Sequence, residues 1–441
     1  MGDGAATTSG ASPLQGQRDL DQFLPRHSRP SERSAGPGRL RRHVPRMSLL
    51  AFRDTNSRLH GLSESQFHVV RAGYACSMHS RAIRVLDLFA GAGGLTAGFH
   101  LASARFRSVA AVELDSQAAA SYSATFEEAD VFTGSIQDWL TKASMPEGID
   151  VVVGGPPCQG FSTLGKQDAE DERNFLWKRY AEVLVRVRPK YFVVENVPAF
   201  SKSQQYRDFL AATQPGERLD KYSFAHRVLN AADYGAPQNR KRTVIIGHHR
   251  DLTSPGFPGA THDPDGTDGL IPYRTVHDAL LGVPVRPDMD ERFGEVRTTV
   301  GNRRLPGAFS PRELHISRTY RPISLERFAA IPKGGNRADL PDDLKAPCWI
   351  RHTTGSLDVM GRLRDDRPSV TIRTEFFKPE KGRYLHPTED RAITHYEAAL
   401  LQGFPDSHRF IGSRTAIARQ IGNAVPIPLG AAIARSLLKE M

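Results

Sequence analysis

The chain has 441 residues, of which 39% are hydrophobic and 24% are charged, and its formal net charge is +10. This composition is typical of a globular protein with room for two or three domains. No apolar run approaches the length of a membrane span, and the first residues, Met1 to Gly16, give no expectation of a signal peptide. The three cysteines are scattered and fit neither a disulfide framework nor a zinc pattern. We therefore expect a protein of the reducing cytoplasm without a bound metal.

The positive charge favours a polyanionic partner and is concentrated in one stretch. Between Arg297 and Arg337 the sequence has nine basic residues and two acidic ones, and most of the basic residues are arginines. Arginine suits phosphate and guanine contacts, so this stretch is a candidate nucleic-acid surface. The alternative is an ordinary solvated face.

The first 80 residues differ in composition from the rest. Residues 1–46 are rich in Gly, Ser, Pro and Arg and show no sustained periodicity, which predicts disorder. Residues 1–80 are therefore interpreted as an N-terminal extension. Met47 and Met78 each precede plausible protein sequence, so a later start is one alternative. A basic tail that adds non-specific DNA affinity is another.

Strands and helices alternate over residues 81–250. Apolar strands are predicted at 83–88, 108–113, 149–153, 191–195 and 243–247, with helices from about 95, at 116–126 and at 175–187. This order predicts an α/β fold with a doubly wound, mostly parallel sheet. Residues 251–413 are rich in Pro, Gly, Arg and Asp and predict a smaller, loop-rich domain. A helical pattern over 416–438 predicts that residues 414–441 return to the first domain.

Two features of the predicted sheet indicate a nucleotide-like cofactor. Asp87-Leu88-Phe89-Ala90-Gly91-Ala92-Gly93-Gly94 forms a glycine-rich turn between a strand and a helix, where a ligand can approach the backbone. Glu113 ends the next strand, where a carboxylate can bind both hydroxyls of a ribose. The two features do not separate a dinucleotide from S-adenosylmethionine. An exposed carboxylate at a strand end is the plainer interpretation of Glu113.

Cys158 follows another predicted strand, in Gly154-Gly155-Pro156-Pro157-Cys158-Gln159-Gly160-Phe161-Ser162. A lone cysteine is most often a small buried hydrophobe. Here Glu195 closes a further strand at the same edge, and Gln238-Asn239-Arg240-Lys241-Arg242 leads into the next one. A thiolate that adds to C6 of cytosine makes C5 a nucleophile toward a methyl sulfonium, provided that an acid engages N3. A thiol, a carboxyl group and arginines are the parts that this chemistry needs.

These motifs, in this order, resemble the C5-cytosine DNA methyltransferase family. The likeness continues through Asp171-Glu172-Arg173-Asn174, Glu195-Asn196-Val197, Leu401-Gln402-Gly403-Phe404-Pro405 and Gln420-Ile421-Gly422-Asn423-Ala424-Val425-Pro426, and runs from about residue 83 to the C-terminus. It implies a Rossmann-like fold that binds S-adenosylmethionine and a target-recognition domain at 251–413. It implies a DNA (cytosine-5)-methyltransferase that flips its target base out of duplex DNA, as a monomer. The enzyme would act with a restriction endonuclease or as an orphan.

The resemblance also assigns roles to individual residues. Cys158 would be the nucleophile and Glu195 would engage N3 and the amine of cytosine, while Arg240 and Arg242 would contact the flipped nucleotide and hold the carboxylate. The implied cofactor residues are Phe89, Gly91, Gly93, Leu95, Glu113, Ile136, Pro156, Asn423 and Val425. The implied DNA contacts are Gln159 and Ser162 in a closing loop and Lys333 and Arg337 in a Gly-Gly loop, with Arg362, Arg364, Arg367 and Arg373 as further candidates that could instead pair with Asp365 and Asp366.

Two positions depart from the family pattern. Ser135 stands where the family often has an acidic residue that binds the adenine amino group, and Asp138 lies too far along the chain to be taken as its substitute. Leu400 stands where the family usually has an arginine that supports the join between the domains, although Arg391 and Glu397 are retained.

Three other functions compete with this interpretation. A tRNA cytosine-C5 methyltransferase belongs to one branch of the same family, but that branch usually has a different tetrapeptide after its cysteine. A catalytically silent DNA-binding relative would have no need of Cys158, Glu195, Arg240 and Arg242. A small-molecule methyltransferase would share the glycine-rich turn and Glu113, but neither the cysteine motif nor the basic second domain.

Overall fold

The computed structural model describes residues 81–157, 176–287, 293–351 and 358–441, and these residues belong to one compact unit. The predicted extension, residues 1–80, lies outside the described residues. The predicted boundaries at 250 and 413 are not tested by this division and stay predictions.

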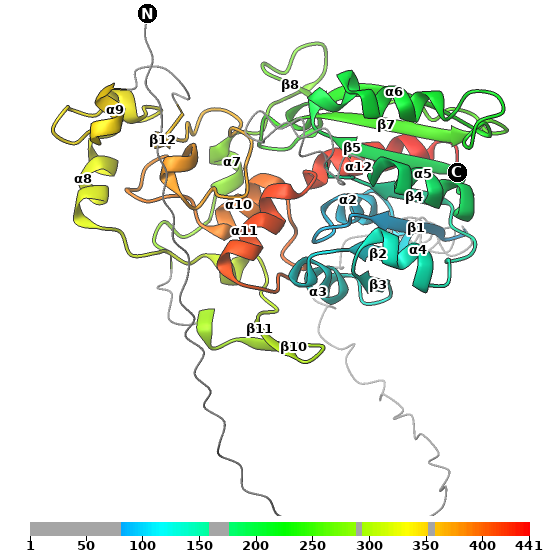
Figure 1. Cartoon of the computed structure of the whole chain (residues 1–441). Coiled ribbons are helices and arrows are strands. Elements are labelled where there is room, and N and C mark those ends of the chain that lie inside the picture. The colour runs from blue at the N-terminus through cyan, green and yellow to red at the C-terminus, as the bar shows by residue number, and fades with distance from the viewer. Residues whose placement is uncertain (1–80, 158–175, 288–292, 352–357) are drawn as a thin grey trace, which may run out of the picture. The chain divides into compact units, whose positions relative to one another are not determined.

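A seven-stranded sheet forms the centre of the described structure, with strand order β3-β2-β1-β4-β5-β7-β6 (Figure 1). β7 runs antiparallel to both β5 and β6, and the other neighbours are parallel. The predicted doubly wound, mostly parallel sheet is therefore confirmed. The strands are β1 (Ile83–Leu88), β2 (Phe106–Glu113), β3 (Asp130–Thr133), β4 (Val151–Gly154), β5 (Tyr191–Asn196), β6 (Tyr222–Asn230) and β7 (Lys241–His249).

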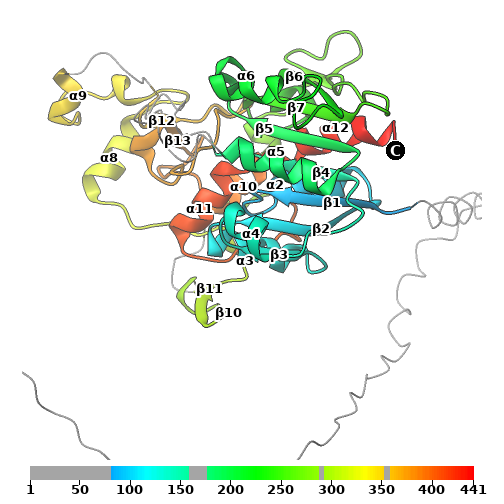
Figure 2. The ribbon, with the colours of Figure 1, turned by 45° about the vertical axis from the view of Figure 1, so that its right-hand side comes forward.

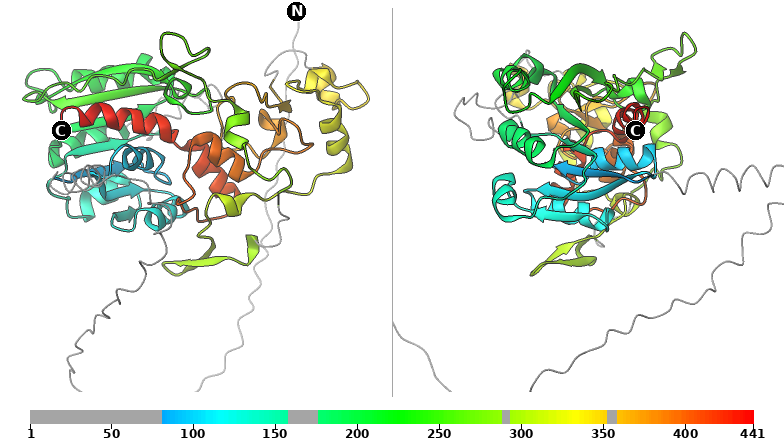
Figure 3. Two further views of the ribbon diagram at one scale, coloured as in Figure 1. Left: turned by 180° about the vertical axis from the view of Figure 1, so that it is seen from behind. Right: turned by 90° about the vertical axis from the view of Figure 1, so that its right-hand side faces the viewer.

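Helices cover both faces of this sheet, because its central strands bury side chains in both directions. On β4, Val151 and Val153 pack with α2 and α12, whereas Val152 packs with α4 and α5. α4 and α5 lie in front of the sheet in Figure 2, and α12 crosses its back in the left view of Figure 3. The helices are α2 (Gly94–Ala102), α3 (Ser116–Thr125), α4 (Ile136–Lys142), α5 (Leu176–Val187), α6 (Gln204–Ala211), α7 (Val276–Leu280), α8 (Pro322–Ala330), α9 (Pro347–Arg351), α10 (His395–Gln402), α11 (Arg414–Asn423) and α12 (Ile427–Leu438).

The helical pattern predicted over 416–438 forms two helices rather than one. α11 ends at Asn423 and α12 begins at Ile427. Pro426 has no N–H to donate and restricts the residue before it, so the chain leaves helical geometry at this point. The break places Asn423 and Val425 beside the carboxyl ends of the central strands, while α12 packs along α2.

The region between β7 and α10 contains short elements, as its composition predicts. Its strands form three two-stranded sheets: β8 (His262–Asp263) with β9 (Ile271–Pro272), β10 (Arg297–Val300) with β11 (Arg303–Pro306), and β12 (Gly361–Arg362) with β13 (Arg383–Leu385). A separate small core centred on Phe328, Ile331, Leu340, Met360 and Leu385 supports α8 and the loops around it. Within the described residues no single helix is long and apolar enough to cross a membrane, although the bent pair α11 and α12 meets the length and composition criteria together.

Candidate active site

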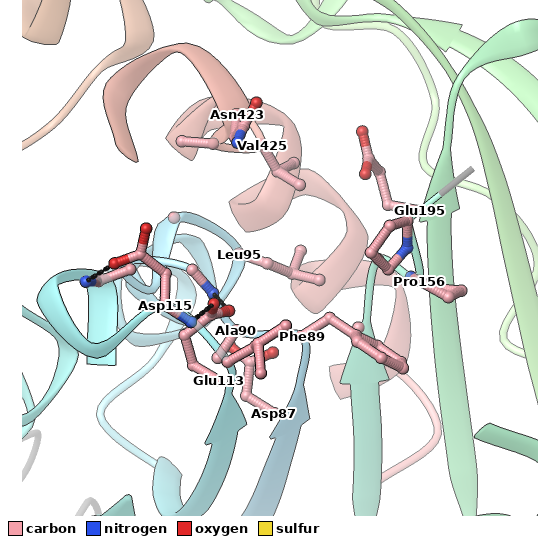
Figure 4. Close-up of a pocket in the computed structure, with 18 of the residues that line it drawn as sticks. Asp87, Phe89, Ala90, Leu95, Glu113, Asp115, Pro156, Glu195, Asn423 and Val425 are labelled. Atoms are coloured by element: carbon pink, nitrogen blue, oxygen red, sulfur yellow. Dashed lines mark hydrogen bonds between the residues drawn. The ribbon is translucent and has the colours of Figure 1, made fainter. Parts of the chain in front are cut away.

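A pocket of about 780 Å³ lies at the carboxyl ends of β1, β2, β4 and β5 (Figure 4). β2 continues the sheet on one side of β1 and β4 continues it on the other, so the pocket lies where the strand order reverses. Open α/β sheets bind their ligands at this point. The pocket volume is within the range of small-molecule sites.

The turn between β1 and α2 forms one wall of the pocket. Phe89 (φ 56°), Gly91 (φ 56°) and Gly93 (φ 86°) all adopt positive φ. A Cβ at Gly91 would meet no atom within 4 Å, whereas one at Gly93 would lie 2.3 Å from the ring of Phe126. Gly91 therefore leaves the backbone open toward the pocket. Gly93 is needed for packing beneath the turn and, unlike the other predicted cofactor residues, does not line the pocket.

The Glu113 carboxylate is fixed in the pocket by the backbone on either side of it. Oε2 accepts a hydrogen bond from the N–H of Gly91 (2.8 Å), and Oε1 accepts one from the N–H of Asp115 (2.7 Å). Burial raises the pKa of this carboxyl group, and the two backbone hydrogen bonds oppose that rise. The orientation of Glu113 is thus set before any ligand binds, with oxygen lone pairs left to accept from hydroxyl groups.

Asp87, at the end of β1, is a second buried carboxyl group in the pocket and was not predicted as a site residue. Its Oδ2 accepts a hydrogen bond from Thr96 Oγ1 (2.6 Å), which also lies 3.1 Å from the hydroxyl of Tyr122. That hydroxyl lies 2.6 Å from Ser108 Oγ, so the four buried polar side chains form one hydrogen-bonded series. Burial raises the pKa of Asp87 from 3.8 to about 7, although the hydrogen bond from Thr96 opposes the rise.

The segment joining α11 and α12 closes the opposite wall with Asn423 and Val425. At the rim, Arg419 on α11 donates to Oδ2 of Asp115 (2.9 Å), while Oδ1 of Asp115 caps the N-terminus of α3. Both residues of this ion pair line the pocket and were missed by the sequence analysis. The signal for Asp115 is its place two residues after Glu113 at a helix start, whereas nothing in the sequence pairs it with Arg419.

Ser135, the first departure from the family pattern, is the N-cap of α4. Its Oγ accepts from the N–H of Asp138 (3.0 Å) and donates to Oδ2 of the same residue (2.6 Å), while Lys142 pairs with Oδ1 of Asp138. Asp138 does not line the pocket, but Ser135, Ile136 and Gln137 do. This wall therefore presents a hydroxyl and an amide and no carboxylate.

Glu195 and Arg242 form the wall of the pocket nearest β4. Arg242 Nε lies 2.7 Å from Glu195 Oε1, although its N–H is not aimed at the oxygen closely enough for a hydrogen bond. A Cβ at Gly155 would lie 3.1 Å from Glu195 Oε2, so the glycine allows the carboxylate to approach the end of β4. The predicted pairing of Glu195 with an arginine is thus present, and Pro156 lines the pocket beside it.

Arg240 lies in the same wall with its guanidinium group turned to the backbone. Its two terminal nitrogens donate to the carbonyl oxygens of Ile372 and Gly422, each at 2.9 Å. Burial and the nearby charge of Arg242 lower the pKa of Arg240 to about 9, which leaves it charged at neutral pH. Arg240 therefore ties β7 to two distant segments that border the pocket, and its contact with a nucleotide stays a prediction.

The join around α10 is supported by a buried ion pair despite the second departure, Leu400. The guanidinium group of Arg391 donates to both oxygens of Glu397, at 2.9 and 2.7 Å. The Glu397 carboxylate also accepts from the N–H of Thr394, which caps α10. This pair fixes the start of α10 without an arginine at position 400.

Of the four further candidate arginines, Arg362 and Arg367 bind groups of the protein itself, whereas Arg364 and Arg373 are exposed and stay predictions. Arg362 is only 4% exposed, and the structure does not support it as a DNA contact. Its guanidinium group donates to the carbonyl oxygens of Phe328, Ile331, His386 and Glu389 and pairs with Asp390. Arg367 pairs with Asp366 at 2.9 Å, which confirms the alternative given for it. The arginine Arg383, which was not predicted, donates to the carbonyl oxygens of Gly334 and Gly335 and so shapes the loop that carries Lys333 and Arg337.

Among the described residues, the predicted DNA contacts Lys333 and Arg337 do not line the pocket. Lys333 is exposed and Arg337 is partly buried, and their contact with DNA stays a prediction. Cys158, Gln159 and Ser162 lie outside the described residues, and the described chain stops one residue before Cys158, at Pro157 on the pocket wall.

The sequence profile of C-5 cytosine-specific DNA methylases matches residues 83–439. The chain belongs to this family. It is 33% identical over 369 residues to the type II methyltransferase M1.HphI of Haemophilus parahaemolyticus, covering 82% of this chain and 88% of the relative. It is 32% identical to the type II methyltransferase M.XorII of Xanthomonas oryzae pv. oryzae, covering 81% and 84%. This DNA (cytosine-5)-methyltransferase also shares its fold with a candidate DNA modification methyltransferase from an Escherichia coli prophage, with a TM-score of 0.59 at 24% identity over 81% of this chain and 99% of that one.

Enzymes of this family use S-adenosylmethionine, and the pocket of this methyltransferase fits that cofactor. The fixed Glu113 carboxylate suits ribose hydroxyls, and the open backbone at Gly91 allows a ligand to approach closely. The buried carboxyl group of Asp87 suits a ligand that carries positive charge. Each of these features is a property of the chain itself.

Proposed function

We propose that the pocket transfers a methyl group to C5 of a cytosine that has been rotated out of duplex DNA. The observation that carries this proposal is the Glu195–Arg242 ion pair, which shares one pocket with Glu113 and with the prolines that lead into Cys158. A site for a nucleoside-like cofactor and a site for a polar base edge thus adjoin. The base must leave the duplex because stacking hides C5 and C6 from both the thiolate and the methyl donor.

The reaction begins with the thiolate of Cys158, which forms a bond to C6 while the ring electrons move toward C5. Glu195, held by Arg242, engages N3 and the exocyclic amine, so that the charge developing on the ring is neutralised. When bound, S-adenosylmethionine supplies an electrophilic methyl group for C5. Loss of the C5 proton to a base or to water then expels the Cys158 sulfur and restores the aromatic ring.

The chain holds its cofactor through the residues that the resemblance assigns. Glu113 would accept from the ribose hydroxyls, and Ile136 would pack on the adenine. Phe89, Gly91 and Leu95 would border the methionine part, with Pro156, Asn423 and Val425 closing the pocket around it. Gly93 contributes by shaping the turn. The 251–413 region is the target-recognition domain in this proposal, with Lys333 and Arg337 contacting DNA and Gln159 and Ser162 acting from the other side.

The biological role follows from the relatives, which are named type II methyltransferases. We place this enzyme in the cytoplasm as a monomer, where it protects one short DNA sequence from a cognate restriction endonuclease or acts as an orphan. The endonuclease would be a separate protein that reads the same sequence.

Conversion sequencing tests this function directly. The full chain and its Cys158→Ala variant are expressed in a host without cytosine methylation, and the host DNA is treated with bisulfite. We expect protected cytosines in one short motif with the wild type and none with the variant. Unprotected DNA from a folded, expressed wild-type protein would contradict the proposal. Methylation of tRNA would then favour the RNA-modifying branch, and cofactor binding without transfer would favour a silent relative.

A further inference from the structure

The carbonyl group of Pro156 receives a hydrogen bond that no assigned function explains. Asn196 Nδ2 donates to it at 3.0 Å, and the amide is buried, with 6% of the residue exposed. Oδ1 of the same amide accepts from the N–H of Val197 at 2.8 Å. The second bond fixes the orientation of the amide, because a flipped amide would oppose oxygen to oxygen at Pro156 and N–H to N–H at Val197.

This hydrogen bond lies where the backbone pairing of two strands stops. β4 and β5 pair in parallel up to Gly154 opposite Val194, so Pro156 lies in register with Asn196, two residues farther on. Pro156 and Pro157 have no N–H, and the ladder cannot continue through them. The Asn196 side chain thus extends the pairing by one link after the backbone has lost the means to do so.

Asn196 is itself held firmly. Its backbone pairs with Thr243 in β7, on the side of β5 away from β4. The neighbouring residue is Glu195, whose carboxylate approaches Gly155 closely. Two adjacent residues of β5 therefore contact the segment before Cys158. Glu195 packs against Gly155, and Asn196 donates a hydrogen bond to Pro156.

We propose that Asn196 is a positioning residue for methyl transfer, which holds the loop leading into Cys158 in register with the strand that carries Glu195. The inference rests on the proposed function, in which the thiol and the carboxyl group must reach one cytosine ring. Catalytic groups displaced by about 1 Å can lose about a hundredfold in rate. The loss of this hydrogen bond should therefore slow the addition to C6 much more than it weakens cofactor binding.

The test measures addition to C6 without methyl transfer. DNA with the methylated motif and tritium at cytosine C5 is mixed with the full chain in the absence of cofactor, because each addition to C6 lets C5 take a proton from water and release the tritium. We expect Asn196→Ala to slow this release by about ten- to a hundredfold. Its dissociation constant for S-adenosylmethionine should stay within about twofold of wild type, because Asn196 bonds to the carbonyl oxygen of the cofactor residue Pro156 and leaves the contacts of Glu113 and Gly91 untouched.

Tyr222→Phe is the matched control. The Tyr222 hydroxyl donates to the carbonyl oxygen of Pro189 at 2.9 Å, so this change also removes one buried hydrogen bond to a proline carbonyl, just before β5 and at the end of that strand away from the pocket. We expect the control to lower thermal stability as much as Asn196→Ala does and to leave tritium release unchanged.

Asn196→Asp separates positioning from folding. Its carboxylate would repel the Pro156 carbonyl oxygen at high pH, whereas the protonated form could donate to it. The ratio of tritium release in this variant to that in wild type should therefore rise as the pH falls. Equal tritium release from wild type and Asn196→Ala would overturn the inference but leave the proposed function standing. The same would follow if Asn196→Ala and Tyr222→Phe lost tritium release, stability and cofactor binding to the same extent. A wild type that neither methylates nor releases tritium would overturn the proposed function and the inference with it.

Discussion

The two sides of the pocket are built in different ways. On the cofactor side, Glu113 is oriented by the backbone N–H groups of Gly91 and Asp115, which are 22 and 2 residues away in the chain. On the base side, the contacts run between separate strands, as from Glu195 to Arg242, or between distant segments, as from Arg240 to Gly422 across 182 residues. The orientation of Glu113 thus depends on contacts that span at most 22 residues, whereas the base side exists only after distant parts of the chain have assembled.

If the two sides are separable, Glu195→Gln should have the largest effect on rate and none on cofactor binding. The amide cannot supply a proton near N3, and removal of an acid–base group typically costs about 10²- to 10⁴-fold in rate. Single-turnover methylation and calorimetry with S-adenosylmethionine measure the two quantities. Glu182→Gln, a surface carboxylate on α5, is the control. A parallel loss of cofactor affinity in Glu195→Gln would show that the two sides of the pocket are not separable.

The reverse pattern is expected for Glu113→Gln. The amide can still accept one of the two backbone hydrogen bonds, but its NH₂ group would face the other N–H. Loss of a hydrogen bond to a charged group costs about 1.5–3 kcal/mol, so the dissociation constant for S-adenosylmethionine should rise about ten- to a hundredfold. The rate at saturating cofactor should stay near that of wild type. A lowered rate under saturation would show that this side also controls the chemistry.

Asp87 gives the cofactor side a pH dependence of its own. Its pKa is raised by burial from 3.8 to about 7, so between these values the folded state holds a proton that the unfolded chain has lost. The free energy of unfolding contributed by this site should therefore fall by about 1.4 kcal/mol for each pH unit as the pH rises. Asp87→Asn removes this dependence. Urea denaturation at several pH values should show the variant gaining stability relative to wild type as pH rises; a constant difference would contradict the burial argument.

The smallest effect is expected at the rim. Arg419 and Asp115 form an ion pair with 50% and 38% of their side chains exposed. Exposed pairs contribute about 0–1 kcal/mol, so Arg419→Gln should weaken cofactor binding by less than about fivefold. Calorimetry at low and high salt tests this, because the difference should shrink as salt screens the pair. A tenfold or larger effect would make the rim part of the binding site.

The sequence predicts the central strands of the sheet and the glycine-rich turn because both depend on local patterns. The apolar runs of β1, β4 and β5 and the turn at Gly91 each lie within a few residues. β3, α4 and β6 were missed. The side chains of β3 are partly or fully exposed, and the middle of β6 is exposed, so neither has the continuous apolar run that marks a buried strand.

The pairing of Arg242 with Glu195 was expected from the resemblance, but the contacts of Arg240 and Arg362 could not be predicted from the sequence. Arg242 pairs with a carboxylate, whereas Arg240 and Arg362 donate to backbone carbonyl oxygens. Arg240 joins distant segments in this way, and Arg362 holds the loops around α8 together. A guanidinium group is equally suited to carbonyl oxygens, carboxylates and phosphates, so only the tertiary structure decides among them. The hydrogen-bonded series of Asp87, Thr96, Tyr122 and Ser108 was also missed, because only the tertiary structure brings these side chains together.

The most direct test of the account is to trap the covalent intermediate and find its cysteine. Duplex DNA with 5-fluorocytosine in the methylated motif is incubated with the enzyme and S-adenosylmethionine, because fluorine at C5 blocks the final loss of the proton. The complex is digested and its peptides are identified by mass spectrometry. We expect the nucleotide to be attached to Cys158. Attachment to Cys76 or Cys348, or methylation of the motif in ordinary DNA without any trapped complex, would contradict it.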